Sequence, residues 1–124
     1  MSTTALILFK DVNDIYHGVS VQYDGYIEYV GKLLHEFWNN ESDIKNLCVN
    51  SKKSIREFGN SFDEIEYYDD TPSRFFALEL KNLDENEALN KVGNFDYTYL
   101  WKEDEPGWVV FHPRYGESPL EKYF

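Results

Sequence analysis

The chain has 124 residues and a formal net charge of −11, with 42% hydrophobic and 18% aromatic residues. A chain of this length supports one hydrophobic core, so we expect a single domain over residues 1–124. Its apolar content is too high for an intrinsically disordered acidic chain. The negative field repels phosphate backbones and anionic lipids, which argues against nucleic-acid or membrane binding and favours a basic protein partner.

Two strands joined by a short loop are the first predicted elements. Residues 5–9 are apolar throughout, which is typical of a central strand covered on both faces. Residues 11–14 form the expected loop. Apolar and polar residues then alternate from Ile15 to Tyr23, which predicts a half-buried strand whose other face is exposed to solvent or only lightly covered.

A structural turn and a helix follow. The turn consists of Asp24, Gly25 and Tyr26, and we expect Gly25 to adopt a positive φ because it has no Cβ to clash. Beyond it, apolar residues recur at helical spacing, which predicts an amphipathic helix lying on the sheet. The side chains expected to face inward are Ile27, Val30, Leu34, Phe37 and Trp38.

This N-terminal region also carries a family resemblance. Met1-Ser2-Thr3-Thr4 opens the chain, and Gln22-Tyr23-Asp24-Gly25-Tyr26 precedes Val30-Gly31 and Leu33-Leu34. The pattern resembles a family of small uncharacterised phage, prophage and plasmid proteins that begin Ser-Thr-Arg and carry a His-Trp-Asp-Gly-Tyr turn. Thr4 and Gln22-Tyr23 depart from that pattern, so any chemistry of its His is absent here. The resemblance implies a phage or mobile-element origin and no known activity.

Two short helical segments are predicted next. Asn40 followed by Asp43 is typical of a helix start, and Cys48 is expected to face the core of that helix. Ser54 and Glu57 have the spacing of a capping box, which predicts a single helical turn ended by Gly59.

The remaining chain is predicted to form two hairpins, a helix and a tail. The expected elements are strands at 62–68 and 74–80, a helix capped by Asp84, strands at 97–101 and 108–112, and an irregular tail at 113–124. The fold class is therefore α+β, with an antiparallel sheet of about six strands in hairpins and two to three helices mainly on one face.

The reactive side chains form no recognisable site. Cys48 is alone, so we expect no disulfide and a reducing, cytoplasmic location. His17, His35 and His112 lack ligand spacing, and we expect no metal, cofactor or catalytic residue. The apolar run at 5–9 is too short for a leader or a membrane span.

Acidic residues are concentrated in one part of the chain. Residues 57–105 hold fourteen carboxylates against four basic side chains, a net charge of −10. We expect a partner-binding surface there if the sheet brings the acidic and aromatic residues together, although a solvated acidic face that maintains solubility is equally compatible with the count. The candidates are Asp63, Glu64, Glu66, Tyr67, Tyr68, Asp69, Asp70, Glu103, Asp104 and Glu105.

These observations favour a non-enzymatic phage or mobile-element accessory protein. It would bind and inhibit a basic host protein that handles nucleic acid or provides defence. One alternative is a small enzyme or small-molecule-binding protein whose site lies near the Asp24-Gly25-Tyr26 turn. A deep pocket there, holding a carboxylate with a perturbed pKa, would favour this alternative. Another is a structural subunit of a homo-oligomer, which the aromatic content permits.

Overall fold

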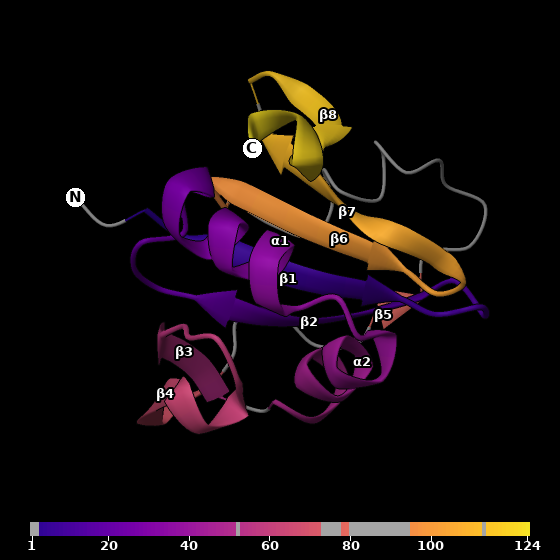
Figure 1. Ribbon diagram of the computed structural model, residues 1–124. Helices are drawn as coiled ribbons and strands as arrows, with labels where there is room; N and C mark the ends of the chain where they lie inside the picture. Colours follow the sequence, from indigo (N-terminus) through magenta and orange to yellow (C-terminus); the bar gives the residue numbers. More distant parts are fainter. Residues whose placement is uncertain (1–2, 52, 73–77, 80–94, 113) are drawn as a thin grey trace.

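The computed structural model describes residues 3–51, 53–72, 78–79, 95–112 and 114–124, which form a mixed β-sheet with two α-helices on one face (Figure 1). The α+β class is thus confirmed. The strands are β1 Ala5–Lys10, β2 Ile15–Val21, β3 Lys53–Glu57, β4 Glu66–Pro72, β5 Leu78–Glu79, β6 Tyr97–Lys102, β7 Glu105–His112 and β8 Gly116–Pro119.

The strand order differs from the predicted run of hairpins. Seven of the described strands follow the order β4-β3-β2-β1-β6-β7-β8, and β5 pairs with β2. β1 pairs in parallel with β6 and β2 in parallel with β3, so the expected purely antiparallel sheet is wrong. Hairpin signals describe neighbours in sequence, whereas both parallel partners come from distant segments.

The sheet has an apolar core on each face. Every residue from Ala5 to Phe9 in β1 is fully buried, as predicted for a central strand. Ile7 belongs to the cluster under the helices, whereas Leu6 and Tyr16 belong to a second cluster on the opposite face. The face of β2 that was expected to be exposed or only lightly covered is therefore buried at Tyr16 and Ser20.

The first helical segment starts with a π-helical turn, η1 Ile27–Gly31, and continues as α1 Lys32–Phe37. Val30, Leu34 and Trp38 are buried as predicted, but Phe37 is 51% exposed. α1 ends at Phe37, and Trp38 follows it with a non-helical ψ of 70°, so the helical spacing assumed for Phe37 and Trp38 does not continue to the second residue. The indole N–H of Trp38 donates to the Gly59 carbonyl at 3.0 Å, which holds Trp38 inward.

The second helix, α2 Glu41–Asn50, begins where the sequence predicted. The Asn40 side chain accepts a hydrogen bond from the Asp43 backbone N–H at 3.1 Å, and Ile44, Leu47 and Cys48 are buried. None of the helices within the described residues is long and apolar enough to cross a bilayer.

The middle of the chain departs most from the predictions. Ser54 and Glu57 lie in β3 rather than in a helical turn, because the segment pairs with β2 and β4 and buries Ile55. Residues 62–64 form a short 3₁₀ turn, η2 Phe62–Glu64, so the expected strand starts at Glu66. β4 pairs with β3, and the described part of the predicted partner strand, β5, pairs with β2, whereas residues 74–77 and 80 lie outside the described residues. The helix predicted at Asp84 lies outside the described residues.

The C-terminal hairpin is confirmed, and the sheet extends beyond it. β6 and β7 pair with Trp101 opposite Trp108. Residues 113–124 were expected to form an irregular tail, but β8 pairs with β7 and leads into the 3₁₀ turn η3 Leu120–Tyr123. Leu120 is fully buried, which ties this segment to the core under the helices.

Candidate functional site

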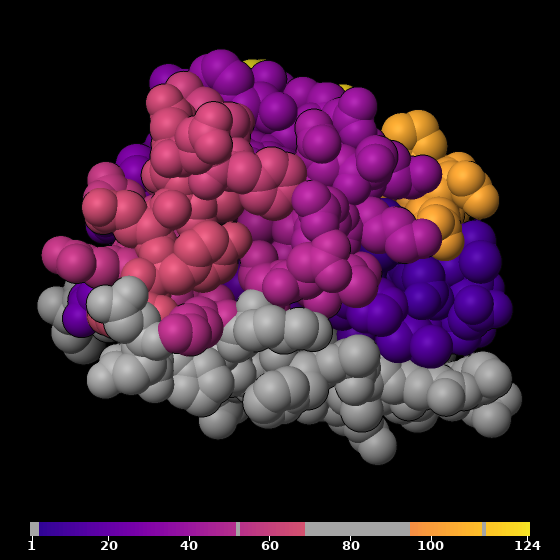
Figure 2. Space-filling view, turned by 90° about the horizontal axis from the view of Figure 1, so that it is seen from below, coloured from indigo at the N-terminus to yellow at the C-terminus, as the bar shows by residue number. Residues whose placement is uncertain are grey.

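The structure separates the predicted acidic residues into two groups. Residues 63–70 lie on η2 and β4, whereas residues 103–105 lie at the β6–β7 turn. β3, β2 and β1 stand between β4 and β6 in the sheet. Figure 2 shows the pink η2–β4 residues and the orange β6–β7 turn on either side of the magenta α2. The sheet therefore does not bring the two acidic groups into one surface.

On η2 and β4, the described carboxylates have different environments. Asp63, Glu64 and Glu66 are all exposed. Glu64 Oε2 accepts a hydrogen bond from the Asn60 backbone N–H at 2.9 Å, so this side chain holds its own loop. The backbone of Asp69 and Asp70 belongs to β4, but their side chains lie outside the described part of the structure.

At the β6–β7 turn, Glu103 has a structural role. Its Oε1 accepts from the Val12 backbone N–H at 3.0 Å, and its Oε2 lies 3.4 Å from Lys45 Nζ. Asp104 has φ 65° and donates its backbone N–H to Glu41 Oε1 at 2.9 Å. Glu105 is exposed. The turn thus joins the β1–β2 loop to α2, a role that sequence spacing alone could not reveal.

The predicted tyrosines next to the β4 carboxylates are partly buried. The Tyr67 and Ser51 hydroxyls lie 2.9 Å apart, and burial raises the pKa of Tyr67 above its ordinary value although the Ser51 bond opposes the change. Tyr68 is partly exposed. Phe62 stands 38% exposed and meets the Trp38 ring edge to face. Aromatic side chains therefore do accompany Asp63 and Glu66.

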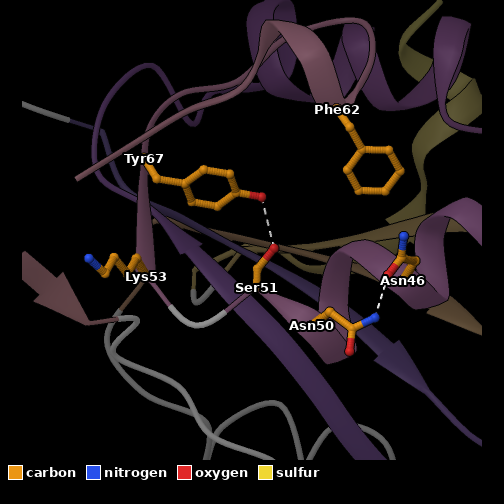
Figure 3. A pocket seen from close by; sticks show the side chains of 6 residues that line it. All are labelled: Asn46, Asn50, Ser51, Lys53, Phe62 and Tyr67. Carbon is orange, nitrogen blue, oxygen red and sulfur yellow. Dashed lines mark hydrogen bonds between the residues drawn. The ribbon is translucent and has the colours of Figure 1, made fainter. Parts of the chain in front are cut away.

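A cavity of about 420 Å³ lies beside Tyr67, between the end of α2 and the β3–β4 pair (Figure 3). Asn50 donates a hydrogen bond to Asn46 at its rim. Its described lining residues are Asn46, Asn50, Ser51, Lys53, Phe62 and Tyr67. Among these described residues, the groups that can ionise are the Lys53 ammonium and the Tyr67 hydroxyl, and the Tyr67 hydroxyl is already bonded to Ser51. The two asparagines were missed from sequence because surface amides on a helix carry no pattern.

The Asp24-Gly25-Tyr26 turn is present, but its glycine acts differently from the prediction. Asp24 has φ 58°, whereas Gly25 is not among the described residues with positive φ. Gly25 donates its N–H to the Thr3 carbonyl at 2.9 Å and accepts from the Tyr99 hydroxyl at 2.7 Å. The turn is thereby fastened to the ends of β1 and β6.

The remaining reactive side chains are held by structural contacts. Cys48 is buried with its Sγ 3.6 Å from the Ile7 carbonyl, and burial raises the pKa of the thiol. His17 Nε2 lies 3.0 Å from Asp11 Oδ2. The His35 ring stacks on Phe124. Within the described residues, no group of three or more His, Cys, Asp or Glu side chains could hold a metal ion.

Comparison with known proteins gives no relative for this chain. No family model, no curated protein and no solved structure matches it. The resemblance to phage and plasmid proteins therefore stays a prediction.

Proposed function

We propose that this chain is a non-enzymatic accessory protein of a phage or mobile element that binds a basic host protein and blocks its action. The proposed contact is the η2–β4 patch, defined by the exposed carboxylates of Asp63 and Glu66 and the neighbouring rings of Phe62 and Tyr67. The observation that carries the proposal is the net charge of −10 over residues 57–105, with both of these carboxylates exposed.

Physical chemistry supports this choice of partner. Carboxylates at the rim of a contact attract a basic surface and raise the association rate, while aromatic rings supply area that can be buried. A protein that handles nucleic acid has such a basic surface, because it must neutralise phosphates. The acidic chain would occupy that surface and exclude the nucleic acid.

The separation of the two acidic groups restricts the proposed partner-binding surface to one of them. The β6–β7 turn lies at the other end of α2, and its Glu103 is engaged with Val12 and Lys45. We therefore place the contact on the η2–β4 patch alone. β4 is the outermost strand on its side of the described sheet, so its outer edge has no strand partner among the described residues.

The test is affinity capture from nuclease-treated host lysate. We expect the double variant Asp63→Lys, Glu66→Lys to lose a partner that the natural chain retains. The matched control reverses Glu36 and Glu121, which are exposed and lie on α1 and η3. Asp11 and Glu41 are unsuitable as controls because both accept structural hydrogen bonds. The proposal would be refuted if both double variants lost the partner to the same extent, or if the Asp63→Lys, Glu66→Lys variant still retained it.

A structural homo-oligomer is a second candidate, favoured by exposed aromatic residues that do not belong to the η2–β4 patch. Tyr115 is 77% exposed, and Phe37 and Phe124 are about half exposed. Exposed aromatics are common at protein interfaces. Size-exclusion chromatography with light scattering distinguishes the candidates, since a monomer at micromolar concentration would exclude a stable oligomer.

A further inference from the structure

A second cavity, of about 250 Å³, lies between η1 and the edge of the sheet formed by β6, β7 and β8. We call it the tyrosine pocket, after Tyr97, Tyr115 and Tyr123 in its wall. The rings of Tyr97 and His112 meet at a steep angle with centroids 5.2 Å apart, and His112 stacks on Tyr115 at 4.8 Å. Four rings from separate segments thus surround one small space.

The lining of the pocket includes a carboxylate as well as aromatic rings. Glu28 contributes this carboxylate. Burial raises the pKa of the Tyr97 hydroxyl, and the nearby charges of Glu28 and Asp96 raise it further. The faces of aromatic rings also carry partial negative charge. A cation entering the pocket would therefore meet both ring faces and a full negative charge.

The His112 ring in the wall is held by the backbone beside it. Its Nδ1 accepts a hydrogen bond from the Arg114 backbone N–H at 3.0 Å. Two basic side chains lie nearby: Arg114 lines the adjoining hollow beside Asp96, and Lys122 Nζ lies 5.4 Å from the centre of the Tyr123 ring. The Lys122 contact shows a ring of this wall already accepting an ammonium group on its face.

We propose that the tyrosine pocket binds the guanidinium group of an arginine side chain presented by a basic protein. A planar guanidinium can stack on a ring and form paired hydrogen bonds with one carboxylate, which an ammonium cannot do. The cavity is smaller than the roughly 300–1,000 Å³ of ordinary small-molecule sites but can hold the end of one side chain. A chain with a net charge of −11 attracts a basic partner to it.

This site is distinct from the η2–β4 patch. β8 and β4 are the two ends of the described strand order, so the pocket and the patch lie at opposite edges of the sheet. Arginine binding in the pocket does not depend on the contact proposed for Asp63 and Glu66. The same variants can therefore test both proposals, because the two proposals predict different results for them.

The experiment is an NMR titration of the full chain at constant ionic strength. The probe is Nα-acetyl-arginine amide, and the control probe is Nα-acetyl-citrulline amide, which has nearly the same shape without the charge. We expect saturable shifts of the Tyr97, His112 and Tyr115 ring signals with the arginine probe and none with the citrulline probe. Equal shifts with both probes, no saturation, or tighter binding of tetramethylammonium would overturn the proposal.

Variants then locate the binding. Glu28→Gln and Tyr115→Ala should each weaken binding of the arginine probe about fivefold or more. The first variant removes the carboxylate that pairs with the cation, and the second removes a ring on which the cation can stack. Tyr115 is 77% exposed, so its replacement should leave the spectrum of the free protein unchanged apart from signals next to it, such as those of the stacked His112 ring. Glu36→Gln, which removes the same charge from the exposed side of α1, should bind normally. Equal weakening by Glu28→Gln and Glu36→Gln, or none by Glu28→Gln, would refute the site.

The η2–β4 variant separates this inference from the proposed function. Asp63→Lys, Glu66→Lys should keep the arginine probe bound even if it loses a captured partner. Loss of the probe from that variant, with its fold intact, would show that general acidity rather than the pocket holds the cation and would overturn the inference.

Discussion

Gly25 illustrates how a single residue can be fixed by the backbone that passes beside it. A Cβ at this position would lie 2.7 Å from both the Ala5 Cβ and the Thr4 carbonyl carbon. The positive torsion angle of the turn belongs to Asp24 instead. Glycine is required here because β1 and the turn approach each other more closely than a side chain permits.

Replacing Gly25 should therefore destabilise the fold through crowding. We expect Gly25→Ala to lower the free energy of unfolding by about 1–3 kcal/mol, as overpacking does in cores. Gly25→Asn separates crowding from a backbone torsional effect as the cause of the destabilisation, because asparagine tolerates a positive φ but adds more volume than alanine. Urea denaturation measures both variants. A milder effect of Asn than of Ala would contradict crowding and support a torsional role.

Asp11 should make the stability depend on pH. Burial alone would raise the pKa of its carboxyl group, but hydrogen bonds from His17, Ile15 and Asn13 outweigh burial and lower the pKa. The ionised group thus stabilises the fold above its unfolded pKa, and this contribution is lost as the pH falls through the lowered folded pKa. Asp11→Asn should be less stable than the natural chain at about pH 5, and the difference should close towards about pH 2. Urea midpoints at both pH values test this, and a constant difference would contradict it.

At the scale of elements, the C-terminal segment completes the core. Leu120 on η3 lies against the helical face of the sheet, where its Cδ1 would be 3.3 Å from a Cβ at Gly31. β8 holds η3 in place by pairing with β7. The segment is therefore part of the fold and not an appendage.

Truncating Leu120 should test that conclusion. Leu120→Ala removes a fully buried side chain, and we expect a loss of about 2–5 kcal/mol in the free energy of unfolding. Phe124→Ala is the control, because Phe124 is 50% exposed and its loss should cost far less. Similar thermal midpoints for Leu120→Ala and the natural chain would mean that η3 does not pack as described.

The start of α2 allows a second test at this scale. Asn40→Ala removes the acceptor for the Asp43 N–H, and we expect it to cost about 0.5–2 kcal/mol. Ser42→Ala changes an exposed neighbour in the first turn and should be close to neutral. Chemical denaturation with helical circular dichroism compares the two, and equal stability of both variants would contradict the cap.

Elements with a local signal could be predicted from the sequence. The apolar run of β1, the Asn40 cap of α2 and the β6–β7 hairpin each depend on residues close together in the chain. β3 and β8 could not be predicted, because pairing with distant strands decides their structure. Phe37 was misplaced because spacing alone does not show where a helix ends.

The candidate sites also divide into features with a local sequence signal and features that depend on distant parts of the chain. The acidic composition of residues 57–105 was visible, but the separation of its two groups follows from strand order. The structural bonds of Glu64 and Glu103 reach backbone groups that sequence cannot locate. The tyrosine pocket had no signal at all, because its rings and Glu28 come from five separate places in the chain.

For the whole molecule, electrostatics should govern any complex. If the η2–β4 patch engages a basic partner, raising salt from about 0.05 M to about 0.5 M should weaken capture strongly, because exposed charges act over a distance that salt shortens. Capture measured across this range tests the expectation. Binding that is insensitive to salt would place the contact on apolar surface instead.

The parallel pairing of β1 with β6 has a consequence for synthesis. β1 finds one neighbour soon after synthesis in β2, but its other neighbour is translated only as Tyr97–Lys102 emerges. Closing so long a loop is slow, and the unpaired edge of an apolar strand can pair with other nascent chains until β6 occupies it. We therefore expect this sheet to reach its native state only after β6 has been translated, and to depend on chaperones when the protein is produced in excess.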